Sequence, residues 1–182
     1  MEPIAPHRFA RKGVGSEVRM SSSNSNSKPF LGLISDTHSL VRPEALAALE
    51  GAELLLHAGD IGSPLVLSQL EAIAPVECIR GNVDMDRWAK DLPDRKQIEW
   101  RGLKFLIVHN RDELALMPPD PGIDVIIFGH SHHPSVDSDG RHLYVNPGSA
   151  GPRRFKLPVS VARLELHQGL PKAEIIELSI PS

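Results

Sequence analysis

The sequence is poor in cysteine and in aromatic residues, and both shortages narrow what the protein can be. Cys78 is the single cysteine among 182 residues, so an intramolecular disulfide is excluded and a zinc site built on thiolates is not expected. Aromatic residues make up only 4%, and we interpret Trp88 and Trp100 as packing residues rather than platforms for stacked bases.

Long apolar runs and an excess of one charge are also missing. No apolar run approaches the about 20 residues that a membrane-spanning helix needs, and the amino terminus lacks the apolar core of a secretory signal. The formal net charge of −3 gives no indication of a large basic surface for binding a nucleic acid or a membrane. A small, localised basic groove is compatible with this charge. With Cys78 interpreted as a small buried hydrophobe, these features predict a cytoplasmic protein in a reducing compartment.

The rest of the composition is that of an ordinary globular protein, with 41% apolar and 24% charged residues. The length suffices for one domain with a sizeable core. The amino-terminal stretch is polar and rich in Ser, Asn and Pro, which predicts a disordered extension over residues 1–28 and a folded domain over 29–182. Met20 is an alternative start, and a transit peptide is disfavoured because Glu2 and Glu17 interrupt the basic residues.

Apolar runs and helical patterns alternate in the first half of the domain. Buried strands are predicted for "FLGLIS", "AELLLHAG" and "PVECIRG". One helix, with Pro43 in its first turn, is expected to bury Leu46 and Leu49, and a second begins after the N-cap Ser63 with Pro64 at its first position. This alternation favours βαβ units with parallel strands.

Turn signals dominate the second half. Arg101-Gly102 separates "KQIEW" from "LKFLIVH", "SDG" separates "HPSVD" from "RHLYVN", and Gln168-Gly169 separates "VSVARLELH" from "LPKAEIIELS". These patterns predict hairpins, and "VIIFG" predicts a further buried strand. The expected fold class is α/β, with two packed β-sheets, crossover helices on the first and further helices on the outer faces.

Polar side chains follow the apolar runs at their carboxyl ends. They are Asp36 and His38, then Asp60, Asn82 and His109, and finally His130 and His132. Ligands of open α/β sheets bind at the carboxyl ends of the strands. A single Asp or His behind a strand is usually a cap or a turn residue, but this interpretation is poor for a set spread over five strand ends.

The chemistry of this set predicts metal binding. Oxygen and nitrogen donors without thiolates suit divalent ions such as Mn, Fe or Zn. The donors exceed what one ion needs, and with one bridging carboxylate they suit two ions about 3.5–4 Å apart. Gly59, Gly81 and Gly129 stand beside the donors and allow the backbone to approach closely.

The motifs "SDTH", "AGD", "GNVD", "VH", "FGHSH" and "VNPGS" follow in the order found in the calcineurin-like metallophosphoesterases. The chain resembles this superfamily from about Phe30 to its end, and most of all its small bacterial and archaeal phosphodiesterases. The resemblance implies the four-layer αββα fold, a two-sheet β-sandwich flanked by helices. It also implies a dinuclear-metal-dependent phosphodiesterase, in which a metal-bound hydroxide attacks phosphorus and no covalent enzyme intermediate forms.

The resemblance further implies which residues hold the metals, and these are also the expected catalytic residues. Asp36, His38 and His132 correspond to ligands of one ion, Asn82, His109 and His130 to ligands of the other, and Asp60 to the bridge between them. Mn²⁺ is the expected ion, with Ni²⁺, Zn²⁺, Fe²⁺ and Mg²⁺ as alternatives. The turn "NPGS" at 146–149 matches a support outside the ligands, and Asp84 is either another support or a surface cap.

The sequence departs from the family pattern at three positions. Val83 stands where many relatives carry a histidine thought to protonate the leaving group, a histidine that the small phosphodiesterases also commonly lack. Leaving-group protonation would then come from water or substrate. Ser39 and Asn110 replace usual glycines, and because Asn tolerates left-handed backbone well we expect little damage from Asn110.

Other polar residues have weaker cases. We interpret His57 as a satisfied core histidine and His133 as exposed, and Arg80 as structural or a distant phosphate contact. Arg153 and Arg154 are a solvated pair or a substrate contact. His7, His142 and His167 belong to no constellation.

Two other functions are less well matched by the sequence. A non-catalytic protein-interaction scaffold with the same fold, as in the retromer subunit, would be expected to have lost ligands, whereas every ligand position here carries a metal-competent residue. A DNA-processing nuclease would usually show a longer chain, the histidine after "GN" and a basic groove. We therefore expect a small phosphodiester substrate, with a nucleotide-derived diester as one option. We expect no membrane partner, and we leave open whether the protein forms a homo-oligomer.

Overall fold

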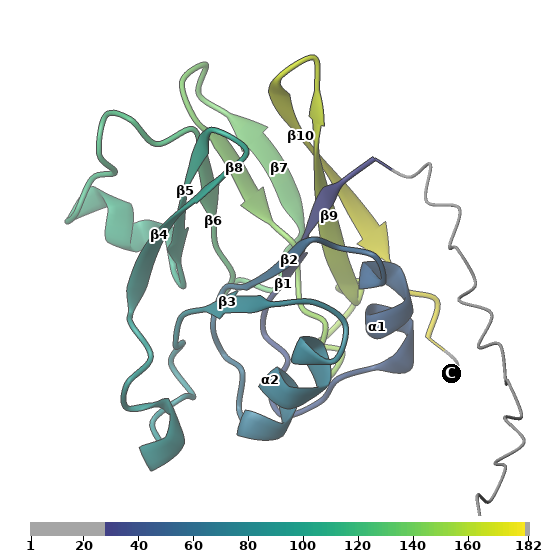
Figure 1. Cartoon of the computed structure of the whole chain (residues 1–182). Helices are drawn as coiled ribbons and strands as arrows, with labels where there is room; N and C mark the ends of the chain where they lie inside the picture. The colour runs from purple at the N-terminus through teal and green to yellow at the C-terminus, as the bar shows by residue number, and fades with distance from the viewer. Residues whose placement is uncertain (1–27, 181–182) are drawn as a thin grey trace, which may run out of the picture.

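The computed structural model describes residues 28–180, and in them two five-stranded sheets pack face to face (Figure 1). The predicted extension therefore lies almost wholly outside the described residues. The first sheet has the order β10-β9-β1-β2-β3. Its strands are β1 (Phe30–Ile34), β2 (Leu54–His57), β3 (Val76–Cys78), β9 (Ser160–His167) and β10 (Leu170–Glu177).

The second sheet has the order β4-β5-β6-β8-β7. Its strands are β4 (Arg95–Trp100), β5 (Leu103–Val108), β6 (Val125–Ile127), β7 (Ser135–Ser138) and β8 (Leu143–Asn146). In each sheet three neighbouring strands are parallel: β1 pairs with β2 and β2 with β3, while β5 pairs with β6 and β6 with β8. Parallel pairing brings the carboxyl ends of these strands to one edge of each sheet.

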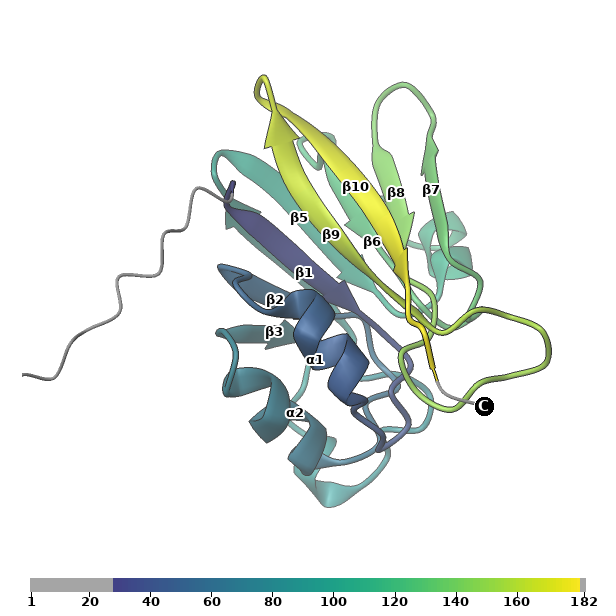
Figure 2. The same cartoon turned by 90° about the vertical axis from the view of Figure 1, so that its right-hand side faces the viewer.

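Helices α1 (Pro43–Leu49) and α2 (Pro64–Glu71) cover the outer face of the first sheet (Figure 2). As predicted, Ser63 caps α2 by accepting a hydrogen bond from the Leu65 N–H at 3.2 Å. Leu49 of α1 is fully buried, and Leu46 packs against the same cluster with part of its side chain accessible. Pro at the start of each helix costs no hydrogen bond there.

The expected hairpins are confirmed. Arg101 and Gly102 join β4 to β5 with φ of 50° and 82°, and Gln168 and Gly169 join β9 to β10 with φ of 54° and 82°. Positive φ at both central residues is what a two-residue hairpin of the I′ type requires. The "SDG" segment joins β7 to β8, which pair antiparallel.

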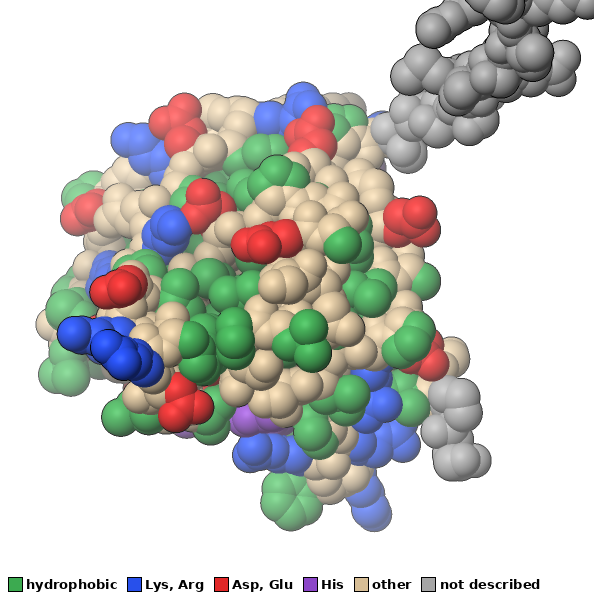
Figure 3. Space-filling model, turned by 60° about the horizontal axis from the view of Figure 1, so that its bottom comes forward, with side chains coloured by type: hydrophobic (Ala, Val, Ile, Leu, Met, Phe, Trp, Pro, Cys, Tyr) green, Lys and Arg blue, Asp and Glu red, His purple; other side chains and the backbone are tan. Residues whose placement is uncertain are grey.

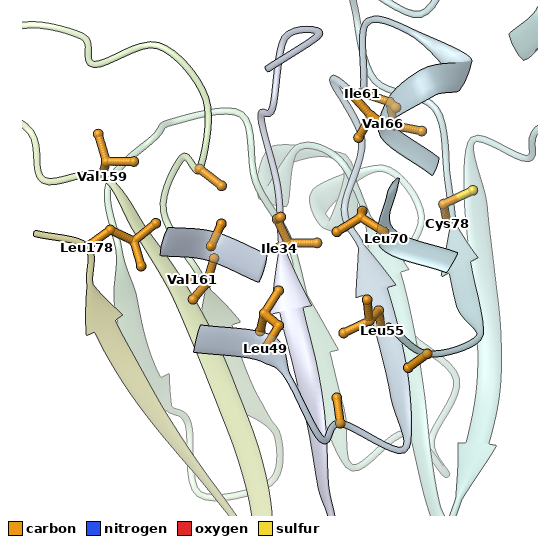
Figure 4. Packing of buried hydrophobic residues seen from close by; sticks show 14 of the residues in the cluster. Ile34, Leu49, Leu55, Ile61, Val66, Leu70, Cys78, Val159, Val161 and Leu178 are labelled. Carbon is orange, nitrogen blue, oxygen red and sulfur yellow. The ribbon is translucent and has the colours of Figure 1, made fainter. Parts of the chain in front are cut away.

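Three hydrophobic clusters of buried side chains lie within residues 28–180. Alternation along β1 explains the first two: Phe30 and Ile34 face the helices, whereas Leu31 and Leu33 face the second sheet. Figure 4 shows the helix-side cluster, in which Leu49 packs among side chains of β1, β2 and β9. These clusters fix both sheets against each other and so fix the strand ends.

The third cluster lies on the outer face of the second sheet, where further helices were expected. The outer face of the second sheet is covered differently from that of the first. Within residues 28–180 the only helical element after β5 is the 3₁₀ helix η2 (Arg111–Ala115). A shorter 3₁₀ helix, η1 (Arg87–Ala89), precedes β4. Leu114 of η2 packs on this cluster. The proline-rich segment "MPPDPG" that follows η2 cannot continue a helix, which explains the thin layer. No helix in the described part of the chain is long and apolar enough to cross a membrane.

Candidate metal centre

The turns that follow β1, β2, β5 and β6 are joined by backbone hydrogen bonds. The Asp36 N–H donates to Gly59 O at 3.0 Å and the His38 N–H to Asp60 O at 3.0 Å. The Gly129 N–H donates to His109 O, also at 3.0 Å. Segments far apart in the sequence are thus tied together at the point where the predicted ligands emerge.

Most of the predicted ligands have left-handed backbone geometry. The φ angles are positive at Asp36 (53°), His38 (45°), Asp60 (55°), His130 (65°) and His132 (57°). Such a conformation costs a residue with a side chain about 1–3 kcal/mol and persists only where the surroundings enforce it. Its concentration on the strand-end residues indicates a functional site rather than a set of ordinary caps.

Glycines let the chain segments approach each other here. A Cβ added to Gly81 would collide with the backbone nitrogen and a carboxylate oxygen of Asp60. A Cβ added to Gly129 would collide with the Ser35 hydroxyl and with Oδ2 of Asp36, 2.6 Å away. The close backbone approach predicted for these glycines is therefore confirmed.

Asp36, His38 and His132 form one tight group, whose potential ligand atoms all lie within 4.8 Å of one another. His132 Nε2 lies 3.2 Å from Asp36 Oδ1 and 3.3 Å from His38 Nε2. Asp36 is held in place through its other oxygen, which accepts hydrogen bonds from the Ser35 hydroxyl at 2.6 Å and the His130 N–H at 3.1 Å. Its Oδ1 is buried without a hydrogen-bond partner.

Asp36, Asp60 and His109 form the second group. His109 Nδ1 donates to the carbonyl of Ala58 at 2.7 Å, which leaves its Nε2 as the ligand nitrogen. That Nε2 lies 3.4 Å from Asp60 Oδ1 and is buried with no hydrogen-bond partner. Asp60 Oδ2 reaches the other group, 3.7 Å from His38 Nε2.

Asn82 and His130 lie beside the second group. The His130 ring stands edge-to-face against that of His109, with centroids 5.2 Å apart. Asn82 is exposed and lines an open cleft together with His109 and Glu113. The structure thus brings both residues to the side of the centre where the sequence places them, and their roles as ligands stay predictions.

Asp84 holds two of the ligand-bearing turns. Its side chain is 1% exposed and accepts backbone hydrogen bonds from Ile61 at 3.0 Å, Gly62 at 2.7 Å and Gly81 at 2.8 Å. Those N–H groups belong to the segments after β2 and β3. Of the two interpretations left open by the sequence, the structure favours a support of the site over a surface cap.

The "NPGS" turn supports the centre from behind, as the resemblance implies. Asn146 Nδ2 donates to Gly129 O at 2.9 Å, and the Ser149 hydroxyl donates to Asp36 O at 2.9 Å. Neither side chain belongs to the two tight groups. Both side chains fix the backbone segments that carry Asp36, His130 and His132.

His57 is a satisfied core histidine, as predicted. Its Nδ1 accepts from the Gly59 N–H at 3.2 Å, and its Nε2 lies 3.0 Å from the Thr37 hydroxyl, which itself donates to Ile61 O. This chain of hydrogen bonds requires the neutral tautomer with the proton on Nε2. Burial lowers the pKa of His57 to about 4, in agreement with a neutral ring.

The electrostatics of the centre keep Asp60 ionised. Burial raises the pKa of Asp60, but the His109 imidazole and the Val83 N–H outweigh it and hold the pKa at about 2. Burial lowers the pKa of His109, but Asp60 and the Ala58 carbonyl outweigh it and the net shift is upward. The pKa of His38 is lowered, mainly by burial.

These residues fit divalent metal ions. Asp36 Oδ1 and His109 Nε2 are buried acceptors that no hydrogen bond satisfies, and both lie within the tight groups. Buried polar atoms are rarely left unpaired, and the exceptions call for an ion or another ligand. Carboxylate and imidazole donors without thiolate match Mn²⁺, Fe²⁺ or Zn²⁺.

Of the remaining sequence assignments, one is corrected. Asn110 has a φ of −110°, so its tolerance of left-handed backbone is not used; instead it caps η2 by accepting from the Asp112 N–H at 3.0 Å. Ser39 does have a positive φ, of 68°. Sequence reasoning also missed Ser35, whose position between an apolar run and Asp36 was the available signal.

The other side chains behave largely as expected. Arg80 pairs with Asp94, and the Trp100 indole donates to Glu53 at 3.1 Å. Cys78 is buried, and burial raises its pKa to about 11. His133 is exposed, and His142 and His167 contact Asp139 and Glu165 away from the centre. Arg154 is exposed, but its Nη2 lies 3.3 Å from His38 Nε2.

Comparisons with known proteins place the fold and the motifs in one family. Residues 30–169 match the model of the calcineurin-like phosphoesterase superfamily domain. A probable metallophosphoesterase of Methanothermobacter thermautotrophicus is 35% identical over 164 residues, which cover 84% of this chain and 94% of the relative. The solved structure of an archaeal phosphodiesterase matches with a TM-score of 0.67 and 25% identity, over 81% of this chain and 99% of that one. Vps29 of Entamoeba histolytica, solved with zinc, has the same fold, with a TM-score of 0.65 and 20% identity over 81% of this chain and 98% of Vps29.

Proposed function

The chain belongs to the calcineurin-like phosphoesterase superfamily, and we propose that it is a dinuclear-metal-dependent phosphodiesterase. The relationship to an archaeal phosphodiesterase supports a diester as the substrate. The predicted ligand set comprises Asp36, His38, Asp60, Asn82, His109, His130 and His132. The proposal adds to the family assignment the number of ions, the ligands and the type of bond that is hydrolysed.

The observation that carries the proposal is the position of the Asp60 carboxylate. One of its oxygens lies 3.4 Å from His109 Nε2 and the other 3.7 Å from His38 Nε2. A carboxylate facing two separate imidazoles is suited to bridge two cations. The low pKa of Asp60, about 2, keeps this bridge charged at neutral pH.

When bound, two divalent ions would supply an activated water nucleophile and stabilise negative charge on the phosphoryl group. The chain's own residues prepare the site for them. The Ala58 carbonyl orients His109, and Ser35 orients Asp36. Because these contacts fix the rings and carboxylates in advance, little reorganisation is needed on binding.

The position after Asn82 bears on the leaving group. Val83 is 46% exposed and has no group that could transfer a proton. Its backbone N–H instead donates to Asp60 Oδ1 at 3.0 Å. A leaving group would therefore take its proton from water or from the substrate itself, and diesters with good leaving groups should react fastest.

Mn²⁺ is the ion we propose, because oxygen donors from Asp36, Asp60 and Asn82 accompany the imidazoles. A small diester, such as a nucleotide-derived one, is the proposed substrate. A cytoplasmic location stays a prediction, and the oligomeric state is left open.

The scaffold alternative is less well supported. The likeness to Vps29, at 20% identity, concerns the fold alone. This chain keeps a complete set of metal-competent residues, and two groups of them cluster within 4.8 Å. A scaffold would have no need for buried acceptors such as His109 Nε2 that lack a hydrogen-bond partner.

The test compares bis(p-nitrophenyl) phosphate with p-nitrophenyl phosphate on metal-stripped protein resupplied with Mn²⁺, Ni²⁺, Zn²⁺ or Mg²⁺. We expect metal-dependent cleavage of the diester in preference to the monoester. Tight metal binding without turnover of either compound would contradict the proposal and favour the scaffold.

A further inference from the structure

Arg154 is an exposed cation beside the proposed metal centre. Its Nη2 lies 3.3 Å from His38 Nε2. Within residues 28–180 its guanidinium makes no other hydrogen bond, and no carboxylate lies within ion-pair distance of it. In Figure 3 a small patch of histidine is visible at the lower edge of the molecule, with Lys and Arg side chains beside it.

The segment that carries Arg154 is anchored to the turn that carries Asp36 and His38. A Cβ on Gly151 would collide with the Thr37 carbonyl, so the two backbones are in close contact. Arg42 Nε donates to Gly151 O at 3.2 Å, and the Ser149 hydroxyl donates to Asp36 O. The placement of Arg154 at the centre therefore follows from the fold and not only from a flexible side chain.

The present contact cannot persist when a metal is bound. A guanidinium only donates hydrogen bonds, so it uses the lone pair of His38 Nε2. That lone pair is also the one a metal ion needs. With the metal in place, the Arg154 guanidinium needs another hydrogen-bond acceptor beside the centre. No carboxylate of residues 28–180 lies within ion-pair distance to serve as that acceptor.

We propose that Arg154 is a substrate-binding residue, whose guanidinium donates to a non-bridging oxygen of the phosphoryl group held at the metal centre. The inference rests on the proposed function and names a specific residue for anion recognition within it. The planar fork of arginine matches two oxygens of a phosphoryl group, and such charge-assisted hydrogen bonds are among the stronger ones in proteins. The same contact would hold inorganic phosphate.

The neighbouring Arg153 offers a matched control. It carries the same charge on the same segment and is exposed, but makes no hydrogen bond or ion pair within the described residues. The variants Arg154→Met, Arg154→Lys and Arg153→Met would be prepared with Mn²⁺ bound. Calorimetry would measure the binding of inorganic phosphate, elemental analysis the Mn²⁺ content, and steady-state kinetics the KM and kcat for bis(p-nitrophenyl) phosphate.

We expect Arg154→Met to weaken phosphate binding about tenfold or more and to raise KM for the diester by a similar factor. The Mn²⁺ content should stay that of the wild type. Arg154→Lys should recover part of the loss, because it restores the charge without the fork. Arg153→Met should stay within about twofold of the wild type in every measurement.

Several results would overturn the inference. If Arg154→Met bound phosphate within about twofold of the wild-type affinity, the proposed contact would be contradicted. An equal loss of phosphate affinity in Arg153→Met would indicate a general charge effect. Loss of Mn²⁺ from Arg154→Met would make the residue a support of His38 instead. Phosphate binding is measured without turnover, so a wild type that hydrolyses no diester but shows the Arg154-dependent affinity would contradict the proposed function alone.

Discussion

The Oδ1 atom of Asp60 lies 3.4 Å from Nε2 of His109, a buried nitrogen that no hydrogen bond satisfies. The Val83 N–H donates to the same oxygen, while Oδ2 faces His38. The carboxylate thus stands between two imidazoles that come from different sheets. This arrangement explains why Asp60 is kept ionised, and it makes this residue the one on which a dinuclear centre depends.

Asp60→Asn should therefore remove metal-dependent hydrolysis. The amide keeps an oxygen for the Val83 N–H but loses the negative charge, so we expect activity to fall by at least about a hundredfold, with less Mn²⁺ bound. Circular dichroism should show an unchanged fold. Turnover equal to that of the wild type would rule out the bridging role.

Asp84→Asn should act through the backbone. Its carboxylate accepts from the N–H groups of Ile61, Gly62 and Gly81, and an amide cannot accept all of them without turning a donor toward one. We expect metal affinity to weaken about 10–100-fold, measured by titration of the stripped protein with Mn²⁺. Asp86→Asn is the control, because Asp86 is exposed and its side chain makes no capping hydrogen bond. Equal effects of both substitutions would show that Asp84 has no special role.

Gly81→Ala should damage the centre by steric contact. The added methyl group would meet the backbone nitrogen and the carboxylate of Asp60, so either Asp60 or the turn after β3 has to move. We expect lower Mn²⁺ content and activity, together with a fall in the melting temperature. Gly122→Ala is the matched control, since its Cβ would meet only the Lys104 side chain at 3.8 Å. A Gly81→Ala protein with full metal content would contradict the close packing described.

His57→Gln should affect stability and leave the metals in place. Loss of the hydrogen bonds to Gly59 and Thr37 should lower the free energy of unfolding by about 1–3 kcal/mol, measured by urea denaturation. Mn²⁺ content should equal that of the wild type. Loss of bound metal would show that the ring is a ligand and that the ligand set is wrong.

The pH dependence of stability follows from the same ring. The pKa of His57 is about 4 in the folded protein and near 6.5 in an unfolded chain, so the unfolded state binds the proton more readily between these values. Stability from this group is present above about pH 6.5 and is lost as the pH falls toward 4, by up to about 3 kcal/mol. The corresponding fall in the free energy of unfolding between pH 6.5 and 4 should be missing in His57→Gln. An identical slope in both proteins would contradict burial of a neutral His57.

Much of the centre could be predicted because its residues follow apolar runs directly. Asp36, Asp60 and His109 each stand one to three positions beyond a strand, and parallel pairing brings the carboxyl ends of the strands in each sheet to one edge. The hairpin at Arg101-Gly102 could also be predicted, because the type of turn depends on the two residues at its centre.

What could not be predicted depends on contacts between distant segments. Asp84 accepts hydrogen bonds from Ile61 and Gly62, which lie more than twenty positions earlier, and nothing in "GNVD" reveals this. Arg154 meets His38 across 116 positions. The thin helical cover of the second sheet and the extended backbone at Asn110 also arise from how the segment after β5 packs, not from a local pattern.

The most direct test of the account is the number of Mn²⁺ ions bound by the metal-stripped wild type and by Asp60→Asn, measured by calorimetric titration with elemental analysis and by electron paramagnetic resonance. We predict two ions in the wild type, with the spectrum of a spin-coupled pair, and loss of that coupling in Asp60→Asn. A single ion in the wild type, or a coupled pair that survives in Asp60→Asn, would contradict a dinuclear centre bridged by Asp60.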